Sequence, residues 1–304
     1  MVRAGCRRAV NLAVKVDVDT LRGYREGLPN LLGLFSAQGF AASIFFSFGP
    51  DNSGKAIRRV FRRGFVSKMV RTRAPSTYGF KTLFYGTLLP APLIVPSNPR
   101  IFERALKDGH DCGVHAWDHV LVQDKLDGMS GGEFRSLFER AAELFFKISG
   151  ERPRSYAAPG WQVSAASLAA TDDLGLKYAS DARGSCPFLP VYRGASFSTP
   201  QIPTTLPTMD EVLGLRGVDD ETLPGLWLDG LSGEWNVLTV HAEMEGLSKL
   251  GVFEKFIEKA KSEGAKFVTL SEIADLAPFA PGEIVQGTLP GRAGTLALQK
   301  CIYN

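Results

Sequence analysis

The stretch Leu12–Asp19, with the sequence LAVKVDVD, predicts a buried β-strand that ends in two aspartates. Apolar and charged residues alternate toward Asp17 and Asp19, which is typical of a strand. Residues 25–39 follow with apolar side chains at helical spacing and a terminal glycine, and the Ile- and Phe-rich residues 41–48 predict a second strand. A strand, a helix and another strand in this order predict the start of an α/β fold.

The same alternation continues along the chain. Further strands are predicted at residues 111–115, 155–158, 178–181, 237–241 and 266–270. Helical patterns between them cover residues 132–148, 165–174 and 253–263. This repetition favours a largely parallel sheet closed as a barrel, within one domain that spans residues 1–304.

The composition is that of an ordinary globular protein, with 44% hydrophobic and 22% charged residues. A formal net charge of +3 is too small for a strongly basic nucleic-acid-binding protein. No segment approaches the roughly 18 apolar residues that a membrane span requires. The first 20 residues lack the apolar core of a signal peptide, so we expect neither export nor a membrane span.

One window departs from this average. Residues 52–102 contain ten Lys or Arg and no Asp or Glu, so the total of +3 leaves a charge of −7 on the rest of the chain. Apolar residues at helical intervals among the arginines predict a basic amphipathic helix. Such a helix suits an anionic membrane surface, because arginines meet the headgroups while Phe and Leu enter the acyl boundary. The residues expected to contact the membrane are Arg58, Arg59, Arg62, Arg63, Phe61 and Phe65.

Two other interpretations of this window stay open. The arginines can be solvated on a surface insertion whose apolar stripe packs on the domain. Nucleic acid is the weaker alternative, because no recognised binding motif accompanies the charge, and we do not expect it as a partner.

Two of the four histidines lie in the stretch HAWDH, after a predicted strand. The spacing of His115 and His119 puts both imidazoles on one side of a helical turn, a common way to present two nitrogen ligands to zinc. Asp17 and Asp19 close the first strand, and a spacing of two directs them to the same side. Because two close carboxylates repel, a cation between them is favourable. Together these motifs predict a two-His, one-carboxylate metal site suited to hydrolysis. Each motif alone has an ordinary alternative, a surface histidine pair or a turn-capping aspartate pair.

Charged residues also follow two later strands. His241 ends the strand at 237–241, and Glu243 follows it, so that a carboxylate could orient the ring or hold its proton. A structural histidine is the alternative. Asp181 and Arg183 add a charged pair after another strand, for which a local salt bridge is the alternative.

The order of these motifs resembles the polysaccharide deacetylase family, which are metal-dependent carbohydrate amide hydrolases on a distorted (β/α) barrel. The resemblance covers nearly the whole chain. It implies Asp19, His115 and His119 as ligands of one divalent metal ion, Asp17 as general base, and His241 as proton donor to the leaving amine. Zinc is the expected metal, although cobalt, manganese and nickel also fit two His and one Asp.

The stretches SFGPDN and HAEMEG and the basic insertion are more specific. They resemble the bacterial members of the family that remove a formyl group from an aminosugar linked to undecaprenyl phosphate. This implies a lipid-linked aminosugar as substrate and a peripheral location at the cytoplasmic face of the inner membrane. A deacetylase of another N-acyl glycan, and a membrane-surface binding protein with a decayed site, are the alternatives.

One position departs from the family pattern. The family carries an arginine in the turn after the fourth segment, where it steadies the base, and this chain has Ala157 in the stretch AAPGW. We expect Arg183 to supply the missing charge to Asp17 or Asp181. Trp161, in the same turn, is predicted either to line the sugar pocket or to be buried in the core.

Overall fold

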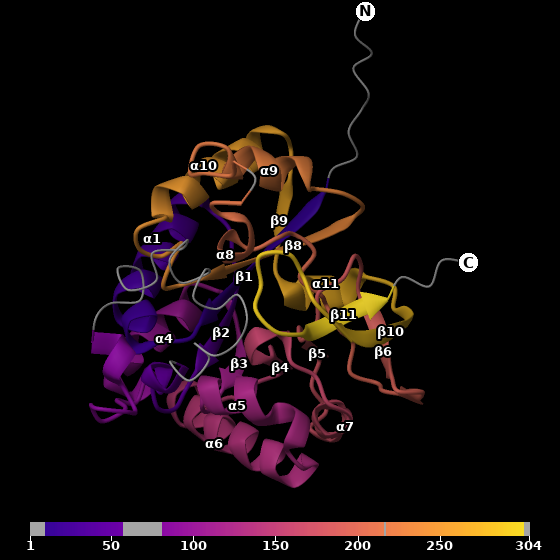
Figure 1. Ribbon diagram of the computed structural model, residues 1–304. Helices are drawn as coiled ribbons and strands as arrows, with labels where there is room; N and C mark the ends of the chain where they lie inside the picture. Colours follow the sequence, from indigo (N-terminus) through magenta and orange to yellow (C-terminus); the bar gives the residue numbers. More distant parts are fainter. Residues whose placement is uncertain (1–9, 57–80, 216, 301–304) are drawn as a thin grey trace, which may run out of the picture.

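The computed structural model describes residues 10–56, 81–215 and 217–300 (Figure 1). A parallel sheet, curled into a half-barrel, has the strand order β5-β4-β3-β2-β1-β8, and β9 pairs with the first residues of β1. Its strands are β1 (Asn11–Val18), β2 (Ser43–Ser47), β3 (Asp111–Ala116), β4 (Ser155–Tyr156), β5 (Tyr178–Ala179), β8 (Trp235–His241) and β9 (Lys266–Val268). The predicted parallel strands and the α/β barrel class are confirmed, and the strands differ from prediction by a few residues at their ends.

Strand β1 lies between β2 and β8, and its two faces differ in chemistry. Val14 and Val16 belong to the large apolar core, whereas Ala13 belongs to a smaller cluster on the opposite face. Because side chains alternate along a strand, Lys15 and Asp17 share the face of Ala13. The charged residues of the opening strand therefore point into the half-barrel.

Helices cover the outer face of this sheet, except that Leu270 and Ile273 of the last helix belong to the smaller cluster on the opposite face (Figure 1). Among the described residues they are α1 (Leu28–Gln38), α4 (Pro99–Lys107), α5 (His119–Lys125), α6 (Gly131–Ser149), α7 (Ala165–Asp173), α8 (Met209–Val212), α9 (Leu223–Asp229), α10 (Leu250–Ser262) and α11 (Leu270–Leu276). The helices predicted at 25–39, 132–148, 165–174 and 253–263 are confirmed as α1, α6, α7 and α10. The first begins later than expected, because a π-helical turn, Gly23–Gly27, precedes it.

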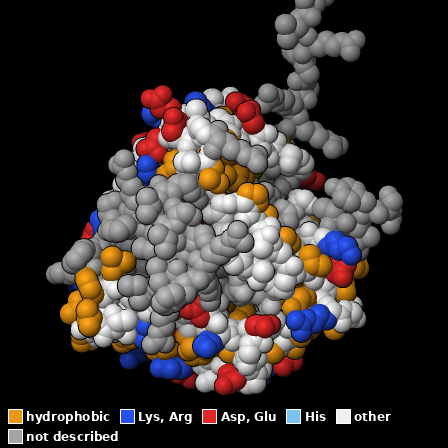
Figure 2. All heavy atoms as spheres, viewed as in Figure 1, with side chains coloured by type: hydrophobic (Ala, Val, Ile, Leu, Met, Phe, Trp, Pro, Cys, Tyr) orange, Lys and Arg blue, Asp and Glu red, His pale blue; other side chains and the backbone are white. Residues whose placement is uncertain are grey.

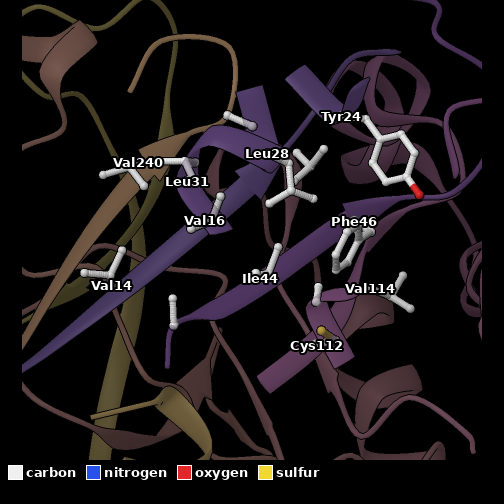
Figure 3. Close-up of a cluster of buried hydrophobic side chains, with 14 of the residues drawn as sticks. Val14, Val16, Tyr24, Leu28, Leu31, Ile44, Phe46, Cys112, Val114 and Val240 are labelled. Atoms are coloured by element: carbon white, nitrogen blue, oxygen red, sulfur yellow. The ribbon is translucent and has the colours of Figure 1, made fainter. Parts of the chain in front are cut away.

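The large core lies between β1 to β3 and the outer helices. Figure 3 shows Val16 of β1, Ile44 of β2 and Val114 of β3 on the side that faces Leu28 and Leu31 of α1. All five side chains are fully buried. Burying a Val, Leu or Ile side chain contributes about 1.5–3 kcal/mol, so this layer anchors β1 to its neighbours.

A second sheet was not predicted. It has the order β11-β10-β6-β7 and comprises β6 (Phe188–Tyr192), β7 (Ala195–Ser196), β10 (Ala280–Gly287) and β11 (Leu296–Lys300). Its small core includes Phe188, Tyr192 and Ile284. Proline and glycine within β6 and β10 weaken the strand pattern, which explains why the sequence alone did not reveal it.

The basic window 52–102 is only partly described. Residues 57–80, and with them the six predicted membrane contacts Arg58, Arg59, Arg62, Arg63, Phe61 and Phe65, lie outside the described residues. No helix within the described ranges is long and apolar enough to cross a membrane. On the face in Figure 2, the basic and acidic side chains of the described residues are interspersed around the rim. The described window does expose three leucines: Leu88, Leu89 and Leu93.

Candidate metal centre and active site

Three side chains meet at the carboxyl end of the parallel sheet. Asp19 follows β1, His115 lies in β3, and His119 is the first residue of α5. His115 Nε2 lies 3.2 Å from Asp19 Oδ1, and His119 Nε2 lies 3.4 Å from Asp19 Oδ2. One ligand atom from each of the three residues lies within 4.8 Å of the others, which is close enough to hold one metal ion. The three predicted ligands are thus brought together.

The local geometry of the two histidines differs from the predicted helical turn. His115 belongs to a strand and His119 to a helix, and a turn at Trp117–Asp118 joins the two. Asp118 caps α5 by accepting a hydrogen bond from Leu121 N at 3.0 Å. The ring centroids of His115 and His119 still lie 5.1 Å apart.

The hydrogen bond of His115 tests whether these residues fit a cation. Its Nδ1 lies 2.7 Å from the carbonyl oxygen of Ala157, which can only accept, so Nδ1 carries the proton. In the neutral ring, Nε2 is then an acceptor, and it faces Asp19 Oδ1, a second acceptor. That buried carboxylate oxygen accepts no hydrogen bond within the described part of the chain. A positive charge at this contact, either a proton on His115 or a divalent metal ion, resolves the facing acceptors. Two imidazoles and a carboxylate are a donor set that fits the metal ion.

The charge of Asp19 agrees with this arrangement. Burial alone would raise the pKa of its carboxyl, but the nearby His119 and His115 outweigh burial and hold the pKa well below its usual range. Asp19 is therefore ionised, as a metal ligand must be.

Glu243 holds the backbone that carries Asp19. Its Oε1 accepts hydrogen bonds from Asp19 N at 3.1 Å, Thr20 N at 2.8 Å and Thr20 Oγ1 at 2.8 Å. Burial, followed by the charge of Asp19, raises the pKa of Glu243 to about 8. The sequence predicted that Glu243 orients the ring of His241. Glu243 instead binds the backbone of Asp19 and Thr20. The second glutamate of HAEMEG, Glu245, accepts from His241 N at 2.9 Å.

Asp17 and His241 lie side by side. They are register partners on the neighbouring parallel strands β1 and β8. Asp17 is only 4% exposed, and among the described residues its Oδ1 accepts no hydrogen bond. Burial alone would lower the pKa of His241, but negative charges, first that of Asp210 and then that of Asp19, outweigh burial and raise it. The pair therefore places a carboxylate with a free acceptor atom beside an imidazole whose pKa is raised.

The predicted role of Arg183 is wrong. Its Nη1 donates to both carboxylate oxygens of Glu211 at 2.6 Å, and its other nitrogens donate to the carbonyls of Thr204 and Leu206. The cation beside Asp17 is Lys15, whose Nζ lies 3.5 Å from Asp17 Oδ2. The backbone of Arg183 pairs with Leu298 of β11, in the sheet that was not predicted, and its side chain binds Glu211 rather than Asp17.

Asp181 and Trp161 lie in the same interior. Asp181 accepts hydrogen bonds from Ala158 N at 2.8 Å and Gln201 Nε2 at 3.0 Å, so it orders the turn after β4. Burial raises the pKa of Asp181 to about 6. Trp161 is 2% exposed and its Nε1 donates to Thr204 Oγ1 at 3.1 Å, as the buried alternative predicts.

Two further polar residues near the site were missed. Asp51, in SFGPDN, is 1% exposed and accepts from Leu21 N at 2.9 Å, which ties it to the loop after β1. Asn52 donates to Asp118 Oδ2 at 2.6 Å, next to His119. The Asp-Asn pair in the loop after a buried strand was the available signal.

Comparisons with known proteins agree with this geometry. The profile of the family described as Polysaccharide deacetylase matches residues 22–179. The chain belongs to the polysaccharide deacetylase family and is an amide hydrolase.

Individual relatives are more specific. The chain is 37% identical over 305 residues to the "Probable 4-deoxy-4-formamido-L-arabinose-phosphoundecaprenol deformylase ArnD" of Shewanella sediminis, covering 98% of this chain and 97% of the relative. It is 30% identical to the protein of the same name from Wigglesworthia glossinidia brevipalpis, covering 93% of this chain and 100% of the relative. The crystal structure of the Bc1960 peptidoglycan N-acetylglucosamine deacetylase shares the fold, with a TM-score of 0.55 at 16% identity, covering 87% of this chain and 88% of that one.

Proposed function

We propose that the protein hydrolyses the formamide of undecaprenyl-phosphate-linked 4-deoxy-4-formamido-L-arabinose. The products are formate and the lipid-linked 4-amino sugar. The observation that carries the proposal is the buried Asp19, His115 and His119 triad beside Asp17 and His241. The full-length similarity to the two deformylases supports the choice of substrate.

The triad would hold one divalent metal. Two imidazole nitrogens and one carboxylate oxygen favour zinc, and cobalt, manganese and nickel accept the same donors. When bound, such a cation supplies a Lewis acid that polarises the formyl carbonyl and lowers the pKa of a water molecule.

The protons are moved by Asp17 and His241. Oδ1 of Asp17 takes a proton from the attacking water, whose oxygen bonds to the formyl carbon. His241 then gives its proton to the sugar nitrogen as the C–N bond breaks, so that formate and an amine leave. The free Oδ1 acceptor of Asp17 and the raised pKa of His241 support these two roles.

The substrate carries an undecaprenyl tail, which stays in a bilayer. We place the protein at the cytoplasmic face of the bacterial inner membrane, bound peripherally through the basic window 52–102. The ten positive charges of that window and the exposed Leu88, Leu89 and Leu93 support an anionic membrane surface as its partner. The aminosugar product would make lipid A more cationic, a modification that confers polymyxin resistance.

The direct test is incubation of the purified protein with formamido- and acetamido-sugar undecaprenyl phosphates, followed by mass spectrometry. We expect the formamido lipid to lose its formyl group, a chelator to stop the reaction, and added zinc or cobalt to restore it. Unchanged formamido lipid in the metal-loaded sample would refute the proposal. Conversion of the acetamido lipid alone would favour a deacetylase of another N-acyl glycan.

A further inference from the structure

Lys15 is a lysine in the middle of a core strand. Its side chain is 0% exposed, although lysine is almost never fully buried unless it is paired. Its neighbours in register are Ser43 of β2 and Thr239 of β8, so it points into the half-barrel. Taking an ammonium group out of water costs several kcal/mol, and an apolar residue here would avoid that cost.

The surroundings of the ammonium group are specific. Nζ donates to the backbone carbonyl of Ser180 at 3.2 Å, across the half-barrel and 165 residues away. It lies 3.5 Å from Asp17 Oδ2. The rings of Phe45 and Trp161 lie 5.6 Å and 5.5 Å from it, at cation–π distance. These contacts fix the position of a side chain that would otherwise be flexible.

We propose that Lys15 is a positioning residue that holds Oδ2 of Asp17 and thereby turns Oδ1 toward the attacking water. The inference rests on the proposed function, in which Asp17 is the base. Lys15 Nζ lies 3.5 Å from Oδ2 of the carboxylate, and Oδ1 accepts no hydrogen bond among the described residues. A carboxylate base needs two different oxygen environments, because one oxygen must stay fixed while the other takes the proton.

The arrangement also accounts for Ala157. The carbonyl of Ala157 accepts from the ring of His115, and no side chain of that residue can reach Asp17. Arg183 is bound to Glu211, and its guanidinium lies 5.4 Å from the ring of Trp161. Arg292 lies 4.4 Å from the same ring and 3.7 Å from Glu211. The charge beside the base thus comes from the base's own strand, two residues before it.

The experiment compares Lys15→Met, Lys15→Arg, Asp17→Asn and the double variant Lys15→Met/Asp17→Asn with the wild type, each loaded with zinc. We expect Lys15→Met to lower kcat by about 10²-fold or more, since a positioned base contributes about 10²–10⁴-fold. KM and zinc affinity by calorimetry should change by less than about threefold, and Lys15→Arg should recover part of kcat. Lys177, paired with Asp275 away from the site, provides the matched control Lys177→Met, for which we expect wild-type kcat.

The double variant separates positioning from folding. If Lys15 acts through Asp17, adding Lys15→Met to Asp17→Asn should lower kcat no further. This background also removes the unpaired buried carboxylate that could prevent the single variant from folding. Additive losses in the double variant, or a kcat for Lys15→Met within about threefold of wild type, would overturn the inference. A wild type that releases no formate would instead overturn the proposed function, and the inference with it.

Discussion

Neighbouring carboxylates in this protein differ in what they contact. Asp19 faces the imidazoles of His115 and His119, and its loop is held by Glu243. Asp17, only two residues earlier, faces Lys15 and lies beside His241 in register. In the proposed function, these different surroundings make one of two identical side chains a metal ligand and the other a base, as in other hydrolases that use paired carboxylates.

Replacing each aspartate should separate these roles. Asp19→Asn removes an anionic ligand, so we expect zinc affinity to fall by at least about 10–100-fold, the range seen even for residues that only support ligands. Asp17→Asn should keep zinc affinity within about threefold and lower kcat by about 10²–10⁴-fold, because only a proton acceptor is lost. Calorimetry and formate release measure the two effects. Equal loss of zinc by both variants would contradict the assignment.

The pH dependence should report the acidic neighbours of His241. In the proposed function His241 is the proton donor and acts when protonated, so we expect activity to be lost as pH rises through its pKa. Asp210 raises that pKa, and Asp210→Asn should therefore move the alkaline limb of kcat/KM to lower pH, on the order of one pH unit. Asp220→Asn, at an aspartate paired with the surface Lys249, is the control and should leave the limb in place. If the alkaline limb of kcat/KM falls at the same pH in both variants, this would argue against His241 as the acid.

At the scale of elements, close packing of β2, β3 and β4 determines the position of the candidate metal ligand His115. Gly113 of β3 leaves room for its neighbours, since a Cβ there would lie 2.4 Å from Ser155 Oγ and 2.7 Å from Phe45 Cε1. His115 is two residues further along the same strand. The distance between β2, β3 and β4 therefore sets where this ligand stands relative to Asp19.

Gly113→Ala should destabilise the fold by about 1–3 kcal/mol, because overpacking forces strands apart. It should also weaken zinc binding through the shift of His115. Gly33→Ala is the matched control, because a Cβ at this position of α1 meets nothing within 4 Å and alanine favours a helix. Denaturant unfolding of the apo and zinc-loaded proteins measures both effects. Equal stability of the two variants would show that the strands accommodate the extra methyl group.

At the scale of the whole molecule, the net charge of +3 results from two regions of opposite charge that nearly cancel. The window 52–102 holds ten positive charges and no acid, while the rest of the chain has a net charge of −7. An anionic membrane surface would attract the positive window and repel the negatively charged rest of the chain. In the proposed membrane binding, this separation of charge would favour one orientation of the protein on the bilayer.

Vesicle binding should depend on this window. Replacing Arg58, Arg59, Arg62 and Arg63 by Gln should weaken co-sedimentation with vesicles rich in phosphatidylglycerol by about two to three orders of magnitude, at about 1 kcal/mol for each arginine near the surface. The matched control replaces four exposed arginines outside the window, Arg135, Arg152, Arg154 and Arg193, and should bind as the wild type does. Neutral vesicles should bind both weakly, and undiminished binding of the first variant to anionic vesicles would reject the proposed surface.

The sequence by itself determined the strands of the parallel sheet, the helices α1, α6, α7 and α10, and the candidate ligands Asp19, His115 and His119. The strands and helices follow from local periodicity, because a buried strand and an amphipathic helix each leave a pattern within ten to twenty residues. Spacing also predicts a site of two histidines and one aspartate, and the family resemblance selects Asp19 rather than Asp17 as the ligand. The motifs were readable because polar side chains end apolar strands at one edge of the sheet.

Only the tertiary structure decided which partner each charge has. Lys15 reaches Ser180 across 165 residues, and Glu243 binds the backbone of Asp19 across 224. Arg183 is taken by Glu211, so the charge beside Asp17 comes from a buried lysine that local patterns treat as a break in an apolar strand. Such pairings depend on how the sheet curls and which side chains share its interior. Spacing along the chain carries no information about the distance between side chains that are far apart in sequence.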